Sequence, residues 1–377
     1  MNVKFPVFRE INTPSYVIDE AALIRNLEIL KKVKEQAGCR ILLAQKAFSA
    51  FAVYPLIERY LDGTTASGLY EAKLGRECFK GEVHVFSPAY TENEIDELKD
   101  ICDHIVFNSV NQLNKYKDKC GSAGLGLRVN PECSTQDTPI YDPCAPGSRL
   151  GVRASDIDPD VFKYIEGLHF HTLCEQGAEP LVKTLAAFEE KFGKYVKGLK
   201  WVNFGGGHHI TKDDYDRDLL VHTICDFKER YGVEVYLEPG EAVALNAGYL
   251  VTKVCDVVQN DIDIAILDAS AACHMPDVLE MPYRPPLFLG GKPGEKANTC
   301  RLASRTCLAG DVIGDYSFDE KLKEGDVLSF EDMAIYSMVK NNTFNGMPLP
   351  DIGIMHADGS YEIIRKFGYE DFKGRLS

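Results

Sequence analysis

Short apolar runs alternate with amphipathic stretches through the first two thirds of the chain. The runs "SYVID", "ILLAQK", "GTTAS", "VHVFS" and "HIVFN" are each followed by a segment with helical periodicity, and "GLGLRVN", "GLHFH", "WVNFGGG" and "EVYLEPG" continue the series. Buried parallel strands are short continuous apolar runs, and the helices between them provide the crossover connections. The pattern therefore predicts a parallel β/α barrel of the TIM type over residues 22–242.

The rhythm changes after about residue 243. The segments "GYLVTKVCDVVQ", "DIAILDAS", "DVIGDYSF", "GDVLSFEDM" and "AIYSMVKNNTF" resemble strands, with turn residues between them and little helical periodicity. They predict a C-terminal β-domain. We assign residues 243–377 to it together with residues 1–21, because the first strand of the chain does not need to belong to the barrel.

Charge and cysteine content narrow the class of protein. The 42 basic and 57 acidic residues give a net charge of −15, which disfavours nucleic acid as a partner and favours a cationic small molecule. No apolar stretch approaches the roughly 20 residues of a membrane span, and the N-terminus lacks the apolar core of a signal peptide. Twelve cysteines are scattered singly, which indicates reduced thiols. A cytoplasmic protein without a membrane partner is the default expectation.

Polar side chains and glycines follow several of the barrel strands. In a β/α barrel the chemistry lies where the strands end, at the carboxyl face. The candidates collected on this basis are Lys46, Ser67 and Gly68, Arg128, His171, Gly205 to Gly207, and Glu238.

Each candidate has an ordinary structural explanation, but one cofactor explains them together. Lys46 could be a solvated loop lysine, Gly205 to Gly207 a flexible turn, and His171 a structural histidine. However, a lysine can form a Schiff base with an aldehyde, a glycine triplet can offer backbone amides to a phosphate, and an imidazole can stack on a flat ring. The carboxylate of Glu238 could keep the nitrogen of a pyridine ring protonated. These are the requirements of pyridoxal 5′-phosphate.

We recognise no metal-binding pattern in the sequence. His169 and His171 are expected to lie on opposite faces of their strand, which would prevent them from sharing an ion. His208 and His209 follow the glycine triplet and are expected to be solvated loop residues.

The order of six motifs resembles a known enzyme family. The motifs "AQKAFS", "HFHTLCEQ", "NFGGGHH", "LEPGEAV", "SRTCLAGD" and "IYSMVKNNTFNG" are similar to those of the alanine-racemase-like, fold-type III decarboxylases that act on diaminopimelate, ornithine and arginine. Within that group the chain most resembles the carboxynorspermidine (carboxyspermidine) decarboxylases. The resemblance covers nearly the whole chain and implies a PLP-binding barrel, a β-domain and a homodimer with shared active sites.

The resemblance also implies residue roles. Lys46 matches the lysine that anchors the cofactor, His171 the histidine on the ring face, and Glu238 the partner of the pyridine nitrogen. The triplet Gly205, Gly206 and Gly207 matches the phosphate-binding glycines, and Tyr336 matches a tyrosine near the phosphate. Cys307 matches a cysteine that enters from the partner subunit and supplies a proton.

Two departures from the family pattern concern the substrate. Ornithine and arginine decarboxylases have an arginine after "EPG", whereas this chain has Glu241, which is suited to an ammonium group. Relatives have an acidic residue after the cysteine, whereas this chain has Leu308. A longer cationic tail would fit both changes. We expect Glu241 and Asp277 to bind it, with Asp311 and Asp268 as further candidates.

The expected activity is therefore that of a PLP-dependent carboxy-lyase. The alternatives are a diaminopimelate, arginine or ornithine decarboxylase, an amino-acid racemase of the same barrel, and a non-catalytic PLP-binding relative. The racemase would need a tyrosine acid where this chain has Cys307, and the non-catalytic relative would be expected to lack Lys46 or Cys307.

Overall fold

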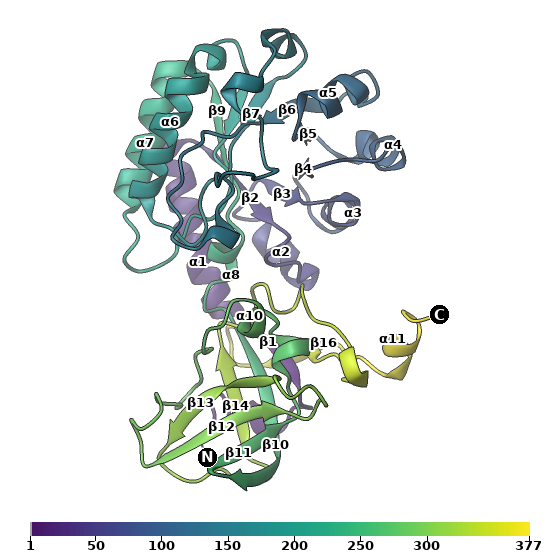
Figure 1. Cartoon of the computed structure of the whole chain (residues 1–377), viewed down its shortest axis with the longest axis vertical. Coiled ribbons are helices and arrows are strands. Elements are labelled where there is room, and N and C mark those ends of the chain that lie inside the picture. The colour runs from purple at the N-terminus through teal and green to yellow at the C-terminus, as the bar shows by residue number, and fades with distance from the viewer. Residues whose placement is uncertain (1) are drawn as a thin grey trace. The chain divides into compact units, whose positions relative to one another are not determined.

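The computed structural model describes residues 2–377 and contains two compact units (Figure 1). One unit is Asn26–Val243, and the other combines the N-terminal segment up to Arg25 with Ala244–Ser377. The sequence placed these boundaries after residues 21 and 242. Helix α1 (Glu20–Ala37) explains the N-terminal difference, because its first turns belong to one unit and the remainder to the other.

The first unit is a closed barrel of eight parallel strands, in the order β2 to β9, with β9 paired to β2. The predicted barrel is confirmed. Its strands are β2 (Arg40–Ala44), β3 (Gly63–Ala66), β4 (Glu82–Phe86), β5 (His104–Phe107), β6 (Gly124–Arg128), β7 (Gly167–His169), β8 (Trp201–Asn203) and β9 (Glu234–Leu237).

Helices surround this barrel and connect its strands (Figure 1). The connecting helices are α2 (Tyr54–Ile57), α3 (Leu69–Cys78), α4 (Glu92–Ile101), α5 (Val110–Tyr116), α6 (Ala178–Val196) and α7 (Arg217–Tyr231), and the short α8 (Glu241–Ala244) follows the last strand, β9. Short 3-10 segments are η2 (Phe51–Val53), η3 (Pro139–Tyr141), η4 (Ala154–Asp156) and η5 (Pro159–Lys163). Each crossover returns the chain to the amino end of the next strand, so all strand carboxyl ends lie at one face.

The barrel interior is packed around the single tryptophan. Trp201 clusters with Leu42, Val106 and Tyr236, and its ring lies against β7. A Cβ atom on Gly167 would lie 2.0 Å from Trp201 Cδ2, so a glycine is needed where the indole approaches the strand. The interior is therefore filled with side chains, and the carboxyl face is left for polar groups.

The second unit is built on an eight-stranded sheet in which β1 pairs antiparallel with β10 and parallel with β15. The predicted β-domain is confirmed, and β1, the first strand of the chain, lies in its sheet. The strands are β1 (Ser15–Asp19), β10 (Gly248–Asn260), β11 (Ile262–Leu267), β12 (Asn298–Ser304), β13 (Val312–Phe318), β14 (Val327–Glu331), β15 (Asp351–Met355) and β16 (Tyr361–Arg365). The helical segments are η1 (Pro6–Arg9), α9 (Ala271–His274), α10 (Asp277–Glu280), η6 (Phe344–Gly346) and α11 (Tyr369–Lys373).

The strand prediction for "AIYSMVKNNTF" is wrong. Residues 334–344 contain no strand, and Tyr336 has a left-handed backbone with φ of 53°. A positive φ at a bulky residue interrupts extended structure, so apolar composition alone misled the prediction. Conversely, the sequence did not predict β12, β15 and β16.

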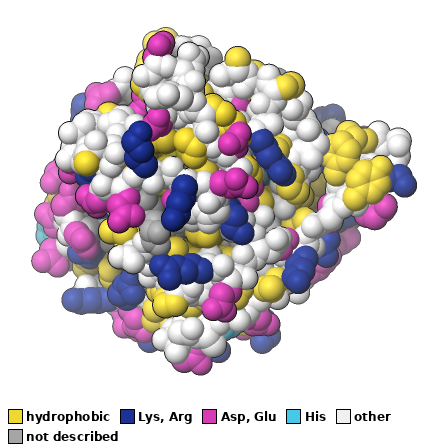
Figure 2. Space-filling model, turned by 90° about the horizontal axis from the view of Figure 1, so that it is seen from below, with side chains coloured by type: hydrophobic (Ala, Val, Ile, Leu, Met, Phe, Trp, Pro, Cys, Tyr) yellow, Lys and Arg dark blue, Asp and Glu magenta, His cyan; other side chains and the backbone are white. Residues whose placement is uncertain are grey.

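The surface carries charges of both signs (Figure 2), and the cysteines form no disulfides. Acidic and basic side chains are interspersed over the face seen in Figure 2. All twelve cysteines are free thiols. No helix formed by residues 2–377 combines the length and the apolar character that a bilayer crossing requires.

Candidate active site

Lys46 follows β2 at the carboxyl face of the barrel. The neighbouring Gln45 is fully buried and fixes this point, because its Nε2 donates to Glu71 O at 2.8 Å and its Oε1 accepts from Tyr54 Oη at 3.1 Å. Burial lowers the pKa of Lys46, although Glu238 and Glu71 oppose the shift. A lysine with a lowered pKa is more often neutral, which is the form that attacks an aldehyde.

Glu238 follows β9 and is held by residues from two neighbouring strands. Asn203 Nδ2 donates to its Oε1 at 2.8 Å, and His169 Nε2 lies 3.3 Å from its Oε2. Burial raises the pKa of Glu238, but attraction to His169 and Lys46 outweighs burial and holds the pKa well below its usual range. The carboxylate is therefore ionised at neutral pH. Sequence reasoning missed Asn203 and His169 as its partners, although both end barrel strands.

The glycine triplet forms a tight turn after β8. A Cβ atom on Gly207 would lie 2.0 Å from Leu173 O, and the residue has φ of 80°. The amides of Gly205 and Gly206 donate to Asn203 Oδ1 at 2.8 Å and to His171 Nδ1 at 2.9 Å. These two amides would have to exchange partners to reach a phosphate, so the predicted role of the whole triplet remains a prediction.

His171 faces this turn and carries no charge at neutral pH. Burial lowers its pKa well below the usual value, and repulsion from Lys46 and Arg128 adds to the shift. Arg128, at the end of β6, donates from Nη2 to His171 O at 3.0 Å and lies over the Phe86 ring at 4.6 Å. A neutral imidazole is suited to contact with a flat aromatic ring.

Two expectations about histidines are wrong. Residues two apart in a strand point to the same face, and ligand atoms of His169, His171 and Glu238 all lie within 4.8 Å of one another. His208 and His209 are buried rather than solvated, and burial lowers the pKa of His208 to about 4.

Glu241, at the start of α8, is part of a second cluster. Its Oε1 lies 3.2 Å from His209 Nε2, and Glu175 contributes a carboxylate within 4.8 Å of both. Burial lowers the pKa of His209, but Glu241 outweighs burial and raises it. Two carboxylates thus flank one imidazole where ornithine and arginine decarboxylases place an arginine.

The barrel residues fit pyridoxal phosphate. The triplet is a turn into which no side chain would fit, Lys46 has a lowered pKa, and Glu238 is an ionised carboxylate held by two neighbours. In addition, His169 Nδ1 is buried without a hydrogen-bond partner, as expected at a site built for a polar ligand. Lys46, His171 and Glu238 are the residues that would hold the cofactor.

Cys307 belongs to the β-unit and lies in the turn between β12 and β13. It is exposed, unlike a structural core thiol. Its amide donates to Asn345 Oδ1 at 2.9 Å, and Asn345 Nδ2 donates to its Sγ at 3.1 Å. The next residue, Leu308, is exposed. The contact with Asn345 was not foreseen from the sequence.

Asp311 and Asp268 have structural roles, contrary to their selection as amine ligands. Asp311 is buried and accepts hydrogen bonds from Ser270 Oγ and Thr306 Oγ1, both at 2.6 Å. It also caps α9 by accepting from the amides of residues 271 and 272. Asp268 accepts from Thr13 Oγ1 and Thr252 Oγ1, also at 2.6 Å. These bonds occupy both carboxylates, so we do not propose either as a substrate ligand.

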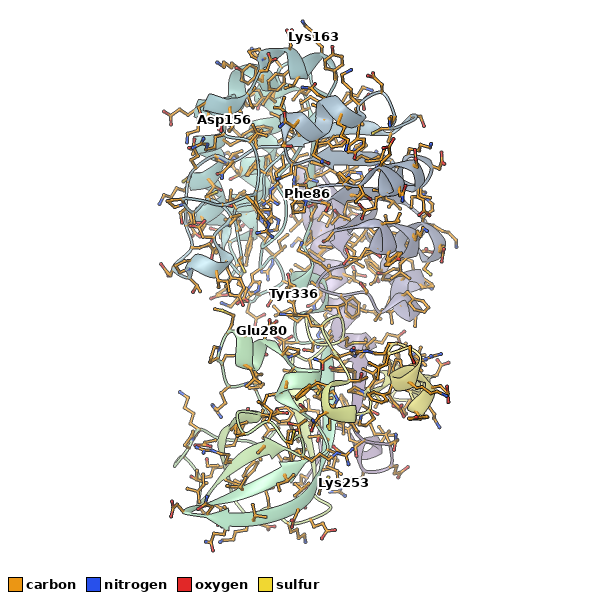
Figure 3. All side chains as sticks on the ribbon, turned by 45° about the vertical axis from the view of Figure 1, so that its right-hand side comes forward. Phe86, Asp156, Lys163, Lys253, Glu280 and Tyr336 are labelled. Carbon is orange, nitrogen blue, oxygen red and sulfur yellow. The ribbon has the colours of Figure 1, made fainter. Side chains whose placement is uncertain are left out.

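Asp277 is paired within the β-unit. Lys340 Nζ contacts Asp277 Oδ1 and lies 2.6 Å from Glu280 Oε2. An ammonium group from a substrate would have to displace Lys340, so the predicted role of Asp277 lacks support from this geometry. Tyr336 lies in the irregular segment after β14 (Figure 3), and its role near a phosphate remains a prediction.

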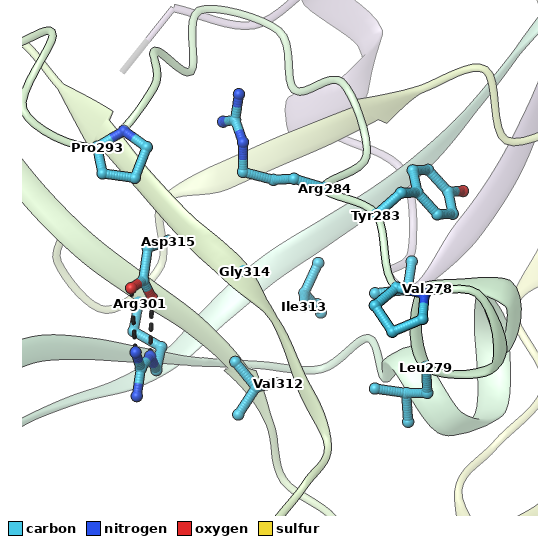
Figure 4. A pocket seen from close by; sticks show the side chains of 11 residues that line it. Val278, Leu279, Tyr283, Arg284, Pro293, Arg301, Val312, Ile313, Gly314 and Asp315 are labelled. Atoms are coloured by element: carbon cyan, nitrogen blue, oxygen red, sulfur yellow. Dashed lines mark hydrogen bonds and ion pairs between the residues drawn. The ribbon is translucent and has the colours of Figure 1, made fainter.

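A separate hollow of about 610 Å³ opens on the β-unit (Figure 4). Its wall is mostly apolar, and its charged groups are already engaged. Arg301 forms two hydrogen bonds with Asp315, at 2.7 and 3.0 Å, and Arg284 donates to Gly291 O at 3.2 Å. The hollow therefore lacks the convergent unpaired groups of a substrate site.

Comparison with known proteins identifies a family model and close relatives. The model described as "Pyridoxal-dependent decarboxylase, C-terminal sheet domain" matches residues 15–334. A carboxynorspermidine/carboxyspermidine decarboxylase of Campylobacter jejuni is 44% identical, with 98% of this chain and 99% of the relative covered. A carboxyaminopropylagmatine decarboxylase of Synechocystis is 40% identical over 98% of this chain and 97% of the relative.

A solved structure agrees with these matches. The crystal structure of a carboxynorspermidine decarboxylase from Campylobacter jejuni, complexed with norspermidine, has a TM-score of 0.90 and 43% identity. The match covers 97% of this chain and 100% of that chain.

Proposed function

Because this chain belongs to the pyridoxal-dependent decarboxylases, we propose that it releases CO₂ from carboxynorspermidine or carboxyspermidine and forms norspermidine or spermidine. The observation that carries the proposal is Glu241, a carboxylate three residues after Glu238, at the position where ornithine and arginine decarboxylases have an arginine. The similarity to the Campylobacter relative along nearly the whole chain supports it. The free thiols suit the reducing cytoplasm, where we place the reaction.

The cofactor and the barrel residues divide the chemistry. Pyridoxal 5′-phosphate, when bound, supplies a ring that accepts the electron pair left when CO₂ departs. Lys46 is the residue that would hold the cofactor through its side-chain amine, which burial keeps more often neutral. Glu238 stays ionised and would keep a proton on the pyridine nitrogen. His171 would contact the ring face and help to position it.

The remaining step is proton return to the α-carbon. We propose Cys307 as the acid, because its thiol is exposed and the turn that carries it is held by Asn345. We further propose a homodimer in which Cys307 of each subunit serves the barrel of the other.

The substrate tail carries ammonium groups spaced along an apolar chain. Glu241 and Glu175 offer two carboxylates around His209, and one of them can accept an ammonium group while the other retains the imidazole. This arrangement favours a substrate with a charged group beyond the reach of a short diamino acid. We propose Glu241 as the main ligand of this tail.

The proposal is tested by CO₂ release from a matched panel of substrates. The panel contains carboxynorspermidine, carboxyspermidine, carboxyaminopropylagmatine, meso-diaminopimelate, arginine and ornithine. We expect the carboxylated triamines to exceed the short amino acids in kcat/KM by about 100-fold or more. Preference for carboxyaminopropylagmatine would instead assign the activity of the Synechocystis relative. Preference for a short amino acid would overturn the substrate assignment.

A charge-neutral variant completes this test. Glu241→Gln keeps the shape of the side chain and removes its charge, so KM for the triamines should rise about tenfold, while kcat changes less. Glu190→Gln, on an exposed position of α6, is the control and should leave both constants unchanged. Unaltered KM in Glu241→Gln would exclude Glu241 as the tail ligand.

Mixing two inactive variants tests the shared site. Lys46→Ala and Cys307→Ala chains, unfolded together and refolded at equal amounts, should recover about one quarter of the wild-type activity, because half the dimers contain one intact site. Each variant refolded alone is the control. If the mixture stays inactive although mixed dimers are detected by mass, the two residues act within one chain.

A further inference from the structure

Asn345 contacts Cys307 through both ends of its side-chain amide. The oxygen accepts the Cys307 backbone amide at 2.9 Å, and the nitrogen donates to Cys307 Sγ at 3.1 Å. Because only the oxygen can accept the backbone proton, the orientation of the amide is determined, and its N–H group must face the sulfur. The sulfur is therefore an acceptor in this contact.

A donor directed at sulfur has two chemical effects. It stabilises the thiolate more than the thiol, because a hydrogen bond to an ionised acceptor is stronger. It also leaves the thiol proton unbound by Asn345, so that this proton can point elsewhere. Both effects assist a group that must give its proton away.

We propose that Asn345 is a positioning residue that prepares Cys307 for proton transfer, an inference that rests on the proposed role of Cys307. In the transfer the S–H bond breaks, its electron pair stays on sulfur, and a C–H bond forms at the substrate α-carbon. Asn345 stabilises the thiolate that remains.

The backbone explains why asparagine occupies this position. Asn345 has φ of 62° and precedes Gly346 with φ of 73°. Asparagine is among the few non-glycine residues that adopt this left-handed conformation readily. Position 345 thus requires a residue that tolerates the turn and also supplies an amide.

The two loops are anchored on the same short helix, α9. On one side, Asn342 Nδ2 donates to Ala272 O at 2.8 Å, which fixes the loop of Asn345. On the other side, Asp311 accepts from Ala271 N at 2.8 Å and from Thr306 Oγ1 at 2.6 Å, which fixes the turn of Cys307. The contact is therefore set before substrate arrives, as positioning requires.

The test replaces the N–H donor of the Asn345 side chain and keeps its oxygen acceptor. In Asn345→Asp, one carboxylate oxygen can still accept the Cys307 amide, but the other places negative charge beside the sulfur. The lost donor and the added charge both disfavour the thiolate, so alkylation of Cys307 by iodoacetamide at pH 7 should slow about tenfold or more. The rate is read in the holoenzyme by mass spectrometry of the tryptic peptide 306–321, in which Cys307 is the only cysteine.

Activity provides the second readout. In Asn345→Asp, kcat should fall while KM stays within about twofold, because Asn345 touches the acid and not the substrate. Asn345→Gly tolerates the turn and removes both contacts, so it should shift alkylation in the same direction by a smaller amount. Asn114→Asp, on an exposed position of α5, is the charge-matched control and should change neither quantity.

The outcomes separate this inference from the proposed function. Wild-type alkylation and kcat in both Asn345 variants would overturn the role of Asn345. Full activity in Cys307→Ala would instead overturn the role of Cys307 as the acid. A shifted alkylation profile with unchanged kcat would show that the contact tunes the thiol without serving proton return, which also overturns the inference.

Discussion

Lys46→Ala is expected to abolish CO₂ release, with kcat reduced by about 10³-fold or more. Lys46 is the residue placed after β2 with a lowered pKa, and alanine cannot bind an aldehyde. The variant should still fold, because the apolar run before Lys46 and the buried Gln45 define the strand end. The measurement is kcat on the preferred substrate of the panel.

Borohydride reduction locates the covalent bond independently of turnover. In the wild-type protein, reduction should add the cofactor mass to the peptide that contains Lys46, and in Lys46→Ala no lysine should carry it. Lys183→Ala, at an exposed position of α6, is the control and should retain both label and activity. A label on another lysine of the wild-type protein would contradict the assignment.

Glu238→Gln is expected to lower kcat by about 100-fold or more while the barrel stays intact. Glutamine keeps the shape of the side chain, and its oxygen can still accept from Asn203 Nδ2. It cannot, however, hold a proton on the pyridine nitrogen by charge, so the ring loses much of its capacity to accept electrons. The measurement is kcat together with the absorbance spectrum of the bound cofactor.

The expected pH dependence of kcat follows from the lowered pKa of Glu238. A carboxylate with a lowered pKa loses its charge only when the pH falls to that low value, so Glu238 should stay ionised from pH 5 to 9. Any fall of wild-type kcat in this range must come from another group. Retention of kcat within about twofold in Glu238→Gln would exclude the proposed role, whereas Glu190→Gln should behave as wild type.

The ends of the barrel strands show how much of the site the local sequence pattern could predict. Short apolar runs between helical segments predicted the barrel, because a strand buried on both faces has a recognisable composition. The position of Lys46, His171 and Glu238 directly after such runs then placed them at one face. The same reasoning failed for His169 and His171, where the face of a strand was assigned wrongly.

The β-domain shows where composition misleads. Asp268 and Asp311 were selected as further candidates to bind the cationic tail, but they are buried acceptors of internal hydrogen bonds. Tyr336 was placed in a strand because its neighbours are apolar, whereas its positive φ interrupts the chain direction. Burial and backbone conformation depend on segments distant in sequence, so composition could not determine them.

The sequence by itself therefore determined the fold class, the family and the residues that follow the barrel strands. Only the tertiary structure decided which side chains contact one another. Asn203 and His169 contact Glu238, and His209 contacts Glu241. In the β-unit, Asn345 contacts Cys307. The physical reason is that apolar periodicity records whether a segment is buried in a helix or strand. A hydrogen bond between side chains depends on which strands and turns become neighbours, and this is determined only by the tertiary fold.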